Sequence, residues 1–292
     1  MSLSELADRG NVSIVEFGGR LGVHDAPCPQ CAIWLGRSAA GRCRKVLRVW
    51  VEPDFVSFHC VRCGAKGFAD KPGARIDPRR LAGQKAEAAA RDQAYGVRQR
   101  QKARWLWRVA RTAPGSLVER YLRSRGITLM PATMSFLAPR KPAHHSAMIV
   151  PFGIPREPEP GRLAITEHEV AGTHLTLLKP DGSGKAGTGR DKLMIGPSLG
   201  FPLVLAPPND LLGLAITEGI EDGLTVHQET GLGVWAAGAA ARMPALAEAV
   251  PDYTETVTIY EHADPAGRRG AAELARLLDR RGIEVFIEGL TA

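Results

Sequence analysis

The chain has 292 residues, of which 44% are hydrophobic and 24% charged, and its formal net charge is +7. This composition is typical of a soluble globular protein with two or three compact units, and it excludes a largely disordered chain. No apolar run approaches the roughly 18 residues of a membrane span. The first residues lack the pattern of a signal peptide. We therefore expect a cytoplasmic protein with no membrane partner.

The net charge hides an uneven distribution along the chain. Residues 1–140 contain 25 Lys and Arg against 11 Asp and Glu, a net charge of +14, whereas residues 141–292 contain 13 against 20, a net charge of −7. A basic front half suits a polyanion, because each phosphate that it neutralises releases counterions. An acidic back half suits divalent cations. A solvated surface of uneven charge would give the same counts, so both interpretations stay open on charge alone.

The first predicted domain, residues 1–70, contains all five cysteines and a predicted hairpin with strands at 46–51 and 55–59. Four of the cysteines form two C-x-x-C knuckles: Cys28, Cys31, Cys60 and Cys63. Two such knuckles complete a tetrahedral thiolate site, which predicts one structural Zn²⁺ in a DNA-binding zinc ribbon. The alternative is a set of buried thiols or a redox pair. Cys43 is predicted to be a core or loop thiol, and His24 and His59 are candidate substitute ligands.

A basic helical linker is predicted over residues 71–115. Residues 70–80 are rich in Pro, Gly and charge, and a helix rich in Ala, Gln and Arg follows over 81–113. Arg104 and Trp105 are its candidate contacts to single-stranded DNA, because a guanidinium binds phosphate and an indole stacks on a base. The alternative is a structural role, in which the tryptophans anchor this helix to the next domain and the arginines are solvated.

The predicted middle region, residues 116–205, begins with a helix over 117–125 and continues with strands at 147–152, 162–166 and 173–178. A Gly-rich basic loop over 179–192 follows. It resembles a phosphate-binding loop without a Walker motif, because glycines allow close backbone approach and its cations bind phosphate. The alternative is a flexible surface loop. Its candidate binding residues are Lys179, Lys185, Arg190 and Lys192.

In the last predicted domain, residues 206–292, strands alternate with helices. The predicted strands lie at 212–217, 233–237, 256–260 and 284–287, and the helices at 221–229, 243–250 and 268–281. Strands separated by helices of this length predict βαβ units and a mostly parallel sheet.

Acidic residues follow two of these strands. Glu218 and Asp222 come after the strand at 212–217, and Glu261 and Asp264 come after the strand at 256–260. Since ligands bind beyond the carboxyl ends of parallel strands, these carboxylates are predicted to share one edge. Oxygen ligands there suit Mg²⁺ or Mn²⁺ together with substrate phosphates, which favours metal-assisted phosphoryl transfer. Ordinary capping of strand ends by acidic residues is the alternative.

The acidic elements resemble those of the Toprim domain, which has an acidic Glu-Gly-x-x-Asp element and a later Asp-x-Asp-x-x-Gly element. Glu218, Gly219 and Asp222 match the first, and Asp264 and Gly267 match the end of the second. The first Asp of the later pair is replaced by His262, with Glu261 just before it. Imidazole is a poor Mg²⁺ ligand compared with carboxylate, so Glu261 takes over that role, or the site binds its second metal only with substrate, or activity is lost.

A Cys-Pro-x-Cys knuckle, a basic hairpin and a Cys-x-x-Cys-Gly knuckle occur in this order, as in the N-terminal zinc ribbon of DnaG-type primases of bacteria and phages, which the zinc segment resembles. The middle region contains Glu-Arg-Tyr-Leu-x-x-Arg-Gly-Ile and ends in Gly-x-Gly-Lys followed by Asp-Lys-Leu-Met-Ile-Gly, and it resembles that of primase-like proteins carried by phages, plasmids and integrated elements. The resemblance implies an α/β chain with an N-terminal zinc ribbon, a helical linker, an α+β middle region and a C-terminal Toprim domain with a Rossmann-like parallel sheet. It implies Glu218 as a general base or metal ligand and Asp222 and Asp264 as magnesium ligands.

A primase would join nucleoside triphosphates on a single-stranded DNA template. No G-x-x-x-x-G-K-[ST] motor motif is visible, so unwinding would need a partner such as a replicative helicase. The alternatives are a non-catalytic DNA-binding protein with a degenerate Toprim domain, for which His262 is the supporting feature, and a Toprim nuclease or topoisomerase fragment.

Overall fold

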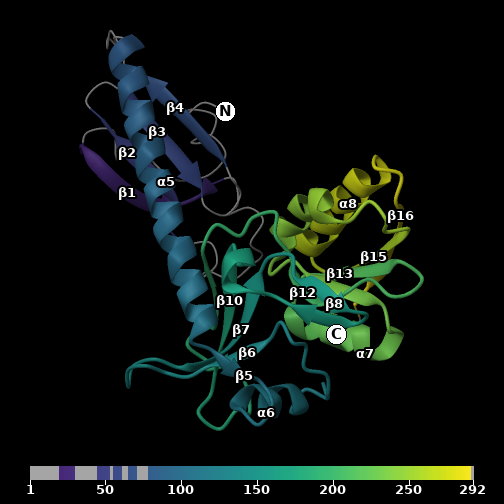
Figure 1. Ribbon diagram of the computed structural model, residues 1–292. Coiled ribbons are helices and arrows are strands. Elements are labelled where there is room, and N and C mark those ends of the chain that lie inside the picture. Colours follow the sequence, from purple (N-terminus) through teal and green to yellow (C-terminus); the bar gives the residue numbers. More distant parts are fainter. Residues whose placement is uncertain (1–19, 30–44, 53–54, 61–64, 71–77, 291–292) are drawn as a thin grey trace. The chain divides into compact units, whose positions relative to one another are not determined.

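The computed structural model describes residues 20–29, 45–52, 55–60, 65–70 and 78–290 (Figure 1). The chain divides into two compact units, Met1–Arg91 and Asp92–Ala292. Within the described residues, every helix is too short or too polar to cross a membrane.

The first unit contains a four-stranded antiparallel sheet in the order β1-β2-β3-β4. Its strands are β1 (Gly22–Pro27), β2 (Lys45–Val51), β3 (Phe55–Cys60) and β4 (Lys66–Asp70). The predicted hairpin is confirmed as β2 and β3. Leu47, Val49 and Val51 alternate with more exposed residues on β2 and pack with Phe58 into a small core. The sheet therefore buries one face, as the period-two pattern predicts.

Helix α5 (Pro78–Arg108) begins three residues before the predicted helix and ends five residues before its predicted end. Residues Arg111–Thr112 form a short strand, β5, which pairs with β6 (Ser135–Leu137). The helical pattern therefore stops where a tertiary strand pairing competes for the backbone.

A five-stranded antiparallel sheet in the second unit has the order β11-β10-β7-β6-β5. Its other strands are β7 (Ser146–Phe152), β10 (Gly172–Leu178) and β11 (Lys192–Ile195). The predicted strands at 147–152 and 173–178 are thus confirmed. The predicted strand at 162–166 is β9 (Arg162–Ala164), which pairs with β8 (Arg156–Glu159) outside this sheet. A 3-10 turn, η1 (Glu167–Glu169), precedes β10.

Helix α6 (Leu117–Arg123) begins where the sequence predicts, two residues short of the expected end. Its N-cap is Ser116, whose hydroxyl accepts a hydrogen bond from the Val118 amide. Tyr121 and Leu122 are fully buried beside residues of β7 such as Val150. This burial fixes α6 to one face of the antiparallel sheet.

The C-terminal sheet has the order β12-β14-β13-β15-β16, and the last four strands in that order run parallel. They are β14 (Gly233–Ala236), β13 (Gly213–Thr217), β15 (Thr256–Glu261) and β16 (Glu284–Gly289). The predicted parallel sheet is confirmed. Strand β12 (Leu203–Ala206) adds an antiparallel edge that the sequence does not predict.

Helices cover both faces of the parallel sheet (Figure 1). Helix α7 (Ile220–Thr230) packs on one face in a core shared with α6 and β7. Helix α8 (Pro265–Asp279) and the 3-10 segment η2 (Ala240–Ala249) pack on the other. The helix predicted at 243–250 is present as this 3-10 segment, which contains Pro244, a residue that cannot donate a backbone hydrogen bond.

Candidate functional site

The turn after β13 places two carboxylates at the carboxyl end of the parallel sheet. Strand β13 is buried along its whole length, and the partly exposed Glu218 follows it directly. Gly219 is the N-cap of α7. A Cβ at Gly219 would overlap the carboxylate of Asp222, so a larger residue there would displace that carboxylate from its present position.

The turn after β15 lies at the same edge. Thr217 is in register with Tyr260, so Glu218 and Glu261 each come next at the end of neighbouring parallel strands. His262 Nε2 lies 3.2 Å from Asp222 Oδ2. The structure therefore brings the two predicted acidic elements into direct contact through this histidine.

Asp264 has a second role at this edge. Its Oδ1 accepts hydrogen bonds of 2.8 Å from the amides of Ala266 and Gly267, which makes Asp264 the N-cap of α8. A carboxylate at a helix N-terminus is stabilised by the helix dipole. The capping that the sequence offers as an alternative is therefore present at Asp264, whereas Glu218 and Asp222 do not cap α7 with their side chains.

The donor chemistry of this edge suits a hard divalent cation. Among the described residues, no group of three or more His, Cys, Asp or Glu side chains is gathered in a metal-binding arrangement. Mg²⁺ is often held by one or two carboxylates together with waters and substrate phosphates, so it does not need three protein ligands. Glu218, Asp222 and Asp264 are the residues that would hold Mg²⁺ or Mn²⁺, and these assignments stay predictions.

The basic loop between β10 and β11 is ordered by its own acidic residues. Asp181 accepts a hydrogen bond from the Ser183 amide, and Asp191 accepts from the amides of Gly187 and Thr188 and from the Thr188 hydroxyl. These bonds lower the pKa of both carboxyls. These hydrogen bonds hold the loop in a defined set of turns, and the role of its cations in phosphate binding stays a prediction.

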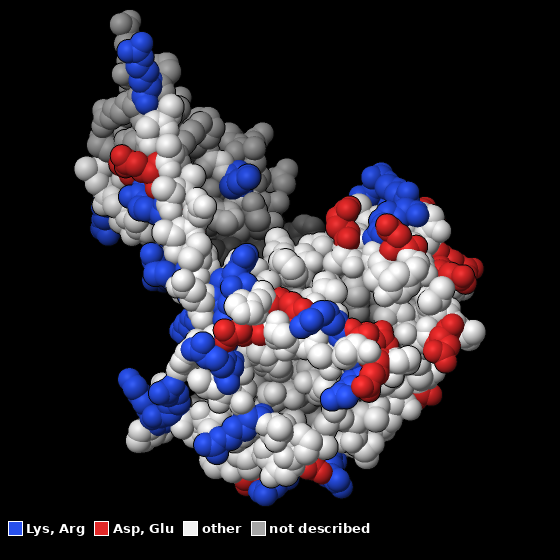
Figure 2. All heavy atoms as spheres, viewed as in Figure 1, with Lys and Arg blue, Asp and Glu red and all other residues white. Residues whose placement is uncertain are grey.

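Lys185 reaches from this loop to α7. Its Nζ lies 3.2 Å from Glu221 Oε1, and the same oxygen accepts a 2.6 Å hydrogen bond from the hydroxyl of Tyr121 on α6. The Glu221 side chain is only 6% exposed. In Figure 2, acidic and basic side chains lie side by side on the face of the second unit that is in view.

The electrostatics keep this buried carboxylate charged. Burial would raise the pKa of Glu221, but the charge of Lys192, the hydrogen bond from Tyr121 and the charge of Lys185 lower it to about 2. Burial, together with the neighbouring Glu221 charge, raises the pKa of Tyr121 far above its usual value. The phenol therefore stays protonated and acts as the donor.

Sequence reasoning missed Glu221 and Tyr121. The available signal was weak: Glu221 is a third acidic residue within five positions, and a basic loop precedes it in the chain. Nothing in the local pattern indicates that Glu221 turns toward that loop while its neighbour Asp222 turns toward His262.

The predicted nucleic-acid contacts Arg104 and Trp105 lie at the end of α5 that belongs to the second unit. Arg104 donates hydrogen bonds to the backbone carbonyls of His168 and Val170. Trp105 packs against the core that contains Leu106, and the guanidinium of Arg140 lies 4.7 Å from its ring centre. These contacts support the anchoring interpretation, and contact with nucleic acid stays a prediction.

Two of the four predicted zinc ligands are described. Cys28 and Cys60 are both buried in the core of the first unit. Leu47 on β2 is in register with both Ala26 and Cys60, so Cys28 and Cys60 lie toward the same end of the sheet. Cys31, Cys43 and Cys63 lie outside the described residues. The zinc site stays a prediction.

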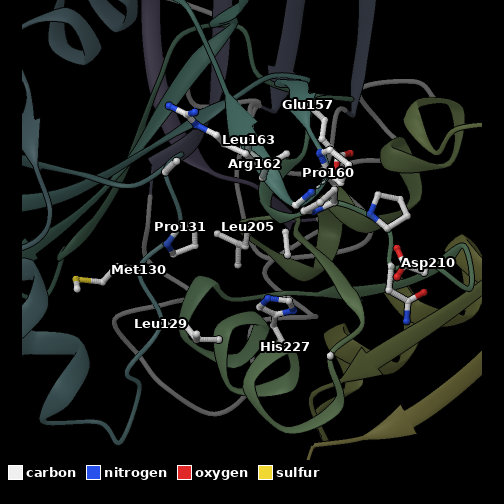
Figure 3. Close-up of a pocket in the computed structure, with 17 residues that line it drawn as sticks. Leu129, Met130, Pro131, Glu157, Pro160, Arg162, Leu163, Leu205, Asp210 and His227 are labelled. Carbon is white, nitrogen blue, oxygen red and sulfur yellow. Dashed lines mark hydrogen bonds between the residues drawn. The ribbon is translucent and has the colours of Figure 1, made fainter.

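A cavity of about 510 Å³ lies at the opposite edge of the parallel sheet (Figure 3). It is lined by residues before β13 such as Asp210, by His227 near the end of α7, and by apolar side chains including Met130 and Leu205. Of the predicted catalytic, metal-binding and nucleotide-binding residues that the structure describes, none lines it. The acidic edge, and not this cavity, is the candidate active site.

Comparison with known proteins agrees with the C-terminal fold. Residues 213–289 match the Toprim domain family, and residues 97–204 match a domain of unknown function, DUF7146. The match to the Toprim family covers the parallel sheet and the helices α7 and α8. Comparison with curated proteins finds no match.

Among solved structures, the chain is similar to the zinc-binding and RNA polymerase domains of the Aquifex aeolicus primase. The two share 17% identity at a TM-score of 0.39, over 98% of this chain and 78% of that one.

Proposed function

We propose that the protein is a DNA primase, which makes short primers on single-stranded DNA by metal-dependent nucleotidyl transfer. The observation that carries the proposal is the meeting of opposite charges at one sheet edge. The Toprim carboxylates Glu218 and Asp222 lie at the end of β13, and Lys185 of the basic loop is paired with Glu221 on the same helical turn as Asp222. A site that joins nucleotides needs metal ligands and phosphate-binding cations together.

In the proposed reaction, the 3′-hydroxyl oxygen of one nucleotide attacks the α-phosphorus of the next nucleoside triphosphate. A phosphorus–oxygen bond forms, the bond to pyrophosphate breaks, and Glu218 accepts the hydroxyl proton or serves as a metal ligand. A bound Mg²⁺ or Mn²⁺ would supply positive charge to the triphosphate. Lys179, Lys185, Arg190 and Lys192 would bind phosphates.

The basic first unit is proposed to bind the template with the help of a structural zinc. A replicative helicase is the proposed partner for unwinding, and a phage, plasmid or integrated element is the proposed context.

Glu218→Gln tests the proposal, because it keeps the side-chain shape and removes the charge. Primer synthesis from labelled nucleotides on single-stranded DNA, with Mg²⁺ or Mn²⁺, should fall by about 10²–10⁴-fold, the usual contribution of a positioned acid–base group. Glu229→Gln, at the exposed far end of α7, is the matched control and should prime normally. Normal priming by Glu218→Gln would place the chemistry elsewhere.

A second candidate is a non-catalytic DNA-binding protein, and the contact between His262 and Asp222 favours it. An imidazole occupies one carboxylate oxygen of a predicted metal ligand. A wild-type protein that binds single-stranded DNA but incorporates no nucleotide with either metal would establish this second function over the first.

A further inference from the structure

The contact among Tyr121, Glu221 and Lys185 joins three segments that are distant in the sequence. Tyr121 is on α6 and is fully buried, Glu221 is on the first turn of α7, and Lys185 is in the basic loop. Both donors converge on one carboxylate oxygen, Glu221 Oε1, at 2.6 Å and 3.2 Å. The basic loop is thereby tied to the helix that carries the Toprim carboxylate Asp222.

Packing alone does not explain a charged residue at this position. A buried ion pair loses hydration that its attraction only partly restores, so an apolar residue of similar size would stabilise the fold as well or better. Buried charges of this kind are retained in some proteins because they fix one geometry. The group whose geometry is fixed here is the ammonium of Lys185, whose side chain is still 32% exposed.

An ammonium carries three N–H donors, and one ion pair leaves two of them for other acceptors. The Glu221 carboxylate also restrains a long side chain that would otherwise lose much rotamer freedom when it binds a ligand. The Lys185 ammonium is therefore held in place next to the helical turn of Asp222, where it can bind an anion. Lys179 and Arg190 of the same loop are exposed.

We propose that Tyr121 and Glu221 are positioning residues that hold Lys185 to bind the phosphates of the incoming nucleoside triphosphate. This inference rests on the proposed primase function. It goes beyond that function by assigning the nucleotide phosphates to Lys185, whose ammonium is paired with a buried carboxylate, rather than to the exposed cations of the loop, Lys179, Arg190 and Lys192.

The test uses the full chain with ATP and single-stranded DNA as probes. KM and kcat for ATP in primer synthesis, the Kd of ATP and the Kd of the DNA are measured for Lys185→Gln, Glu221→Gln and the double variant. Each single variant should raise the KM for ATP by about tenfold, the value of one charge-assisted hydrogen bond, and leave the Kd of the DNA unchanged. The double variant should be no worse than Lys185→Gln, because the two residues act as one unit.

Matched controls are Lys141→Gln and Glu229→Gln, which remove exposed charges from outside the proposed site. Tyr121→Phe keeps the buried ring and removes only the hydroxyl, so it tests the same inference if Glu221→Gln does not fold. It should raise the KM for ATP less than Lys185→Gln does, with no further increase when the two are combined.

Three outcomes would overturn the inference: an unchanged KM in Lys185→Gln, effects that multiply in the double variant, or a loss of DNA affinity without a change in KM. A wild type that neither binds ATP nor extends primers would instead overturn the proposed function. The two failures are distinguishable, because the first appears only in the variants of an active wild type.

Discussion

His262 is the residue at which the segment similar to the Toprim domain departs from the acidic pattern that the resemblance predicts. Its Nε2 lies 3.2 Å from Asp222 Oδ2, so a carboxylate that would bind metal is shared with an imidazole. The consequence should be a high requirement for divalent metal, because imidazole is a poor ligand for Mg²⁺.

His262→Asp should lower the Mg²⁺ concentration for half-maximal priming by about tenfold, a typical effect of groups that tune a metal site. A Mg²⁺ titration of primer synthesis measures it. His144→Asp, on an exposed loop, adds the same charge away from the site and should leave the titration unchanged. An unaltered requirement in His262→Asp would mean that the family's carboxylate has no function here.

A second histidine makes the stability of the fold depend on pH. His174 is buried on β10, and burial, followed by the charge of Lys192, lowers its pKa from 6.5 to about 4. Between these values the unfolded chain takes up a proton that the folded chain does not. Stability is therefore fully present above pH 6.5 and falls as the pH falls toward 4, by up to about 3 kcal/mol.

Urea unfolding at pH 7.5 and pH 5 measures this effect. In His174→Gln the difference in unfolding free energy between the two pH values should shrink, even if the variant is less stable at both. An equal pH dependence in the variant and the wild type would assign the titration to other groups.

At the scale of elements, the sequence predicts the alternating C-terminal third best. The strands β13, β14 and β15 are short and largely apolar and are each followed by a turn and a helical segment, so local pattern and tertiary structure agree. The antiparallel edge strand β12 is not predictable in this way, because a run such as Leu203–Ala206 carries no information on its direction or partner.

In the candidate site, too, some contacts could be predicted from the sequence and others could not. The carboxylates at the ends of β13 and β15 follow from the topology of parallel strands, since neighbouring strands end at the same edge. The bond between Tyr121 and Glu221 joins residues that are 100 positions apart, and only the packing of α6 against α7 brings them together.

The packing of α8 against η2 gives a test at this scale. A Cβ at Gly270 of α8 would overlap the backbone carbonyl of Ala240. Gly270→Ala should therefore destabilise the fold by about 1–3 kcal/mol, the usual cost of overpacking. Gly96→Ala in α5 meets nothing within 4 Å and should be neutral or stabilising by about 0.5–1 kcal/mol. Chemical denaturation measures both, and equal stabilities would contradict the close contact.

At the scale of the whole molecule, the chain forms two compact units, so a substitution can unfold one unit and leave the other folded. Cys28 and Cys60 are buried in the core of the first unit, which among the described residues is small. A structural metal would therefore supply much of the folding free energy of that unit.

Cys60→Ser should lose the one zinc that we predict per chain and unfold the first unit, while the second unit stays folded. Metal analysis measures the zinc content, and amide hydrogen exchange shows which of the two units unfolds. Full zinc occupancy in Cys60→Ser, or a disulfide between knuckle cysteines in the wild type, would contradict the predicted zinc ribbon.

Strand β16 ends the parallel sheet, and among the described residues it has a strand neighbour, β15, on one side only. An edge strand can pair with another copy of the chain, and Phe286 and Ile287 are each about half exposed on this strand. Glu284 and Glu288 give this strand a negative charge that repels a second copy. Colloidal stability then depends on ionic strength: concentrated salt screens that repulsion, and aggregation should begin at β16.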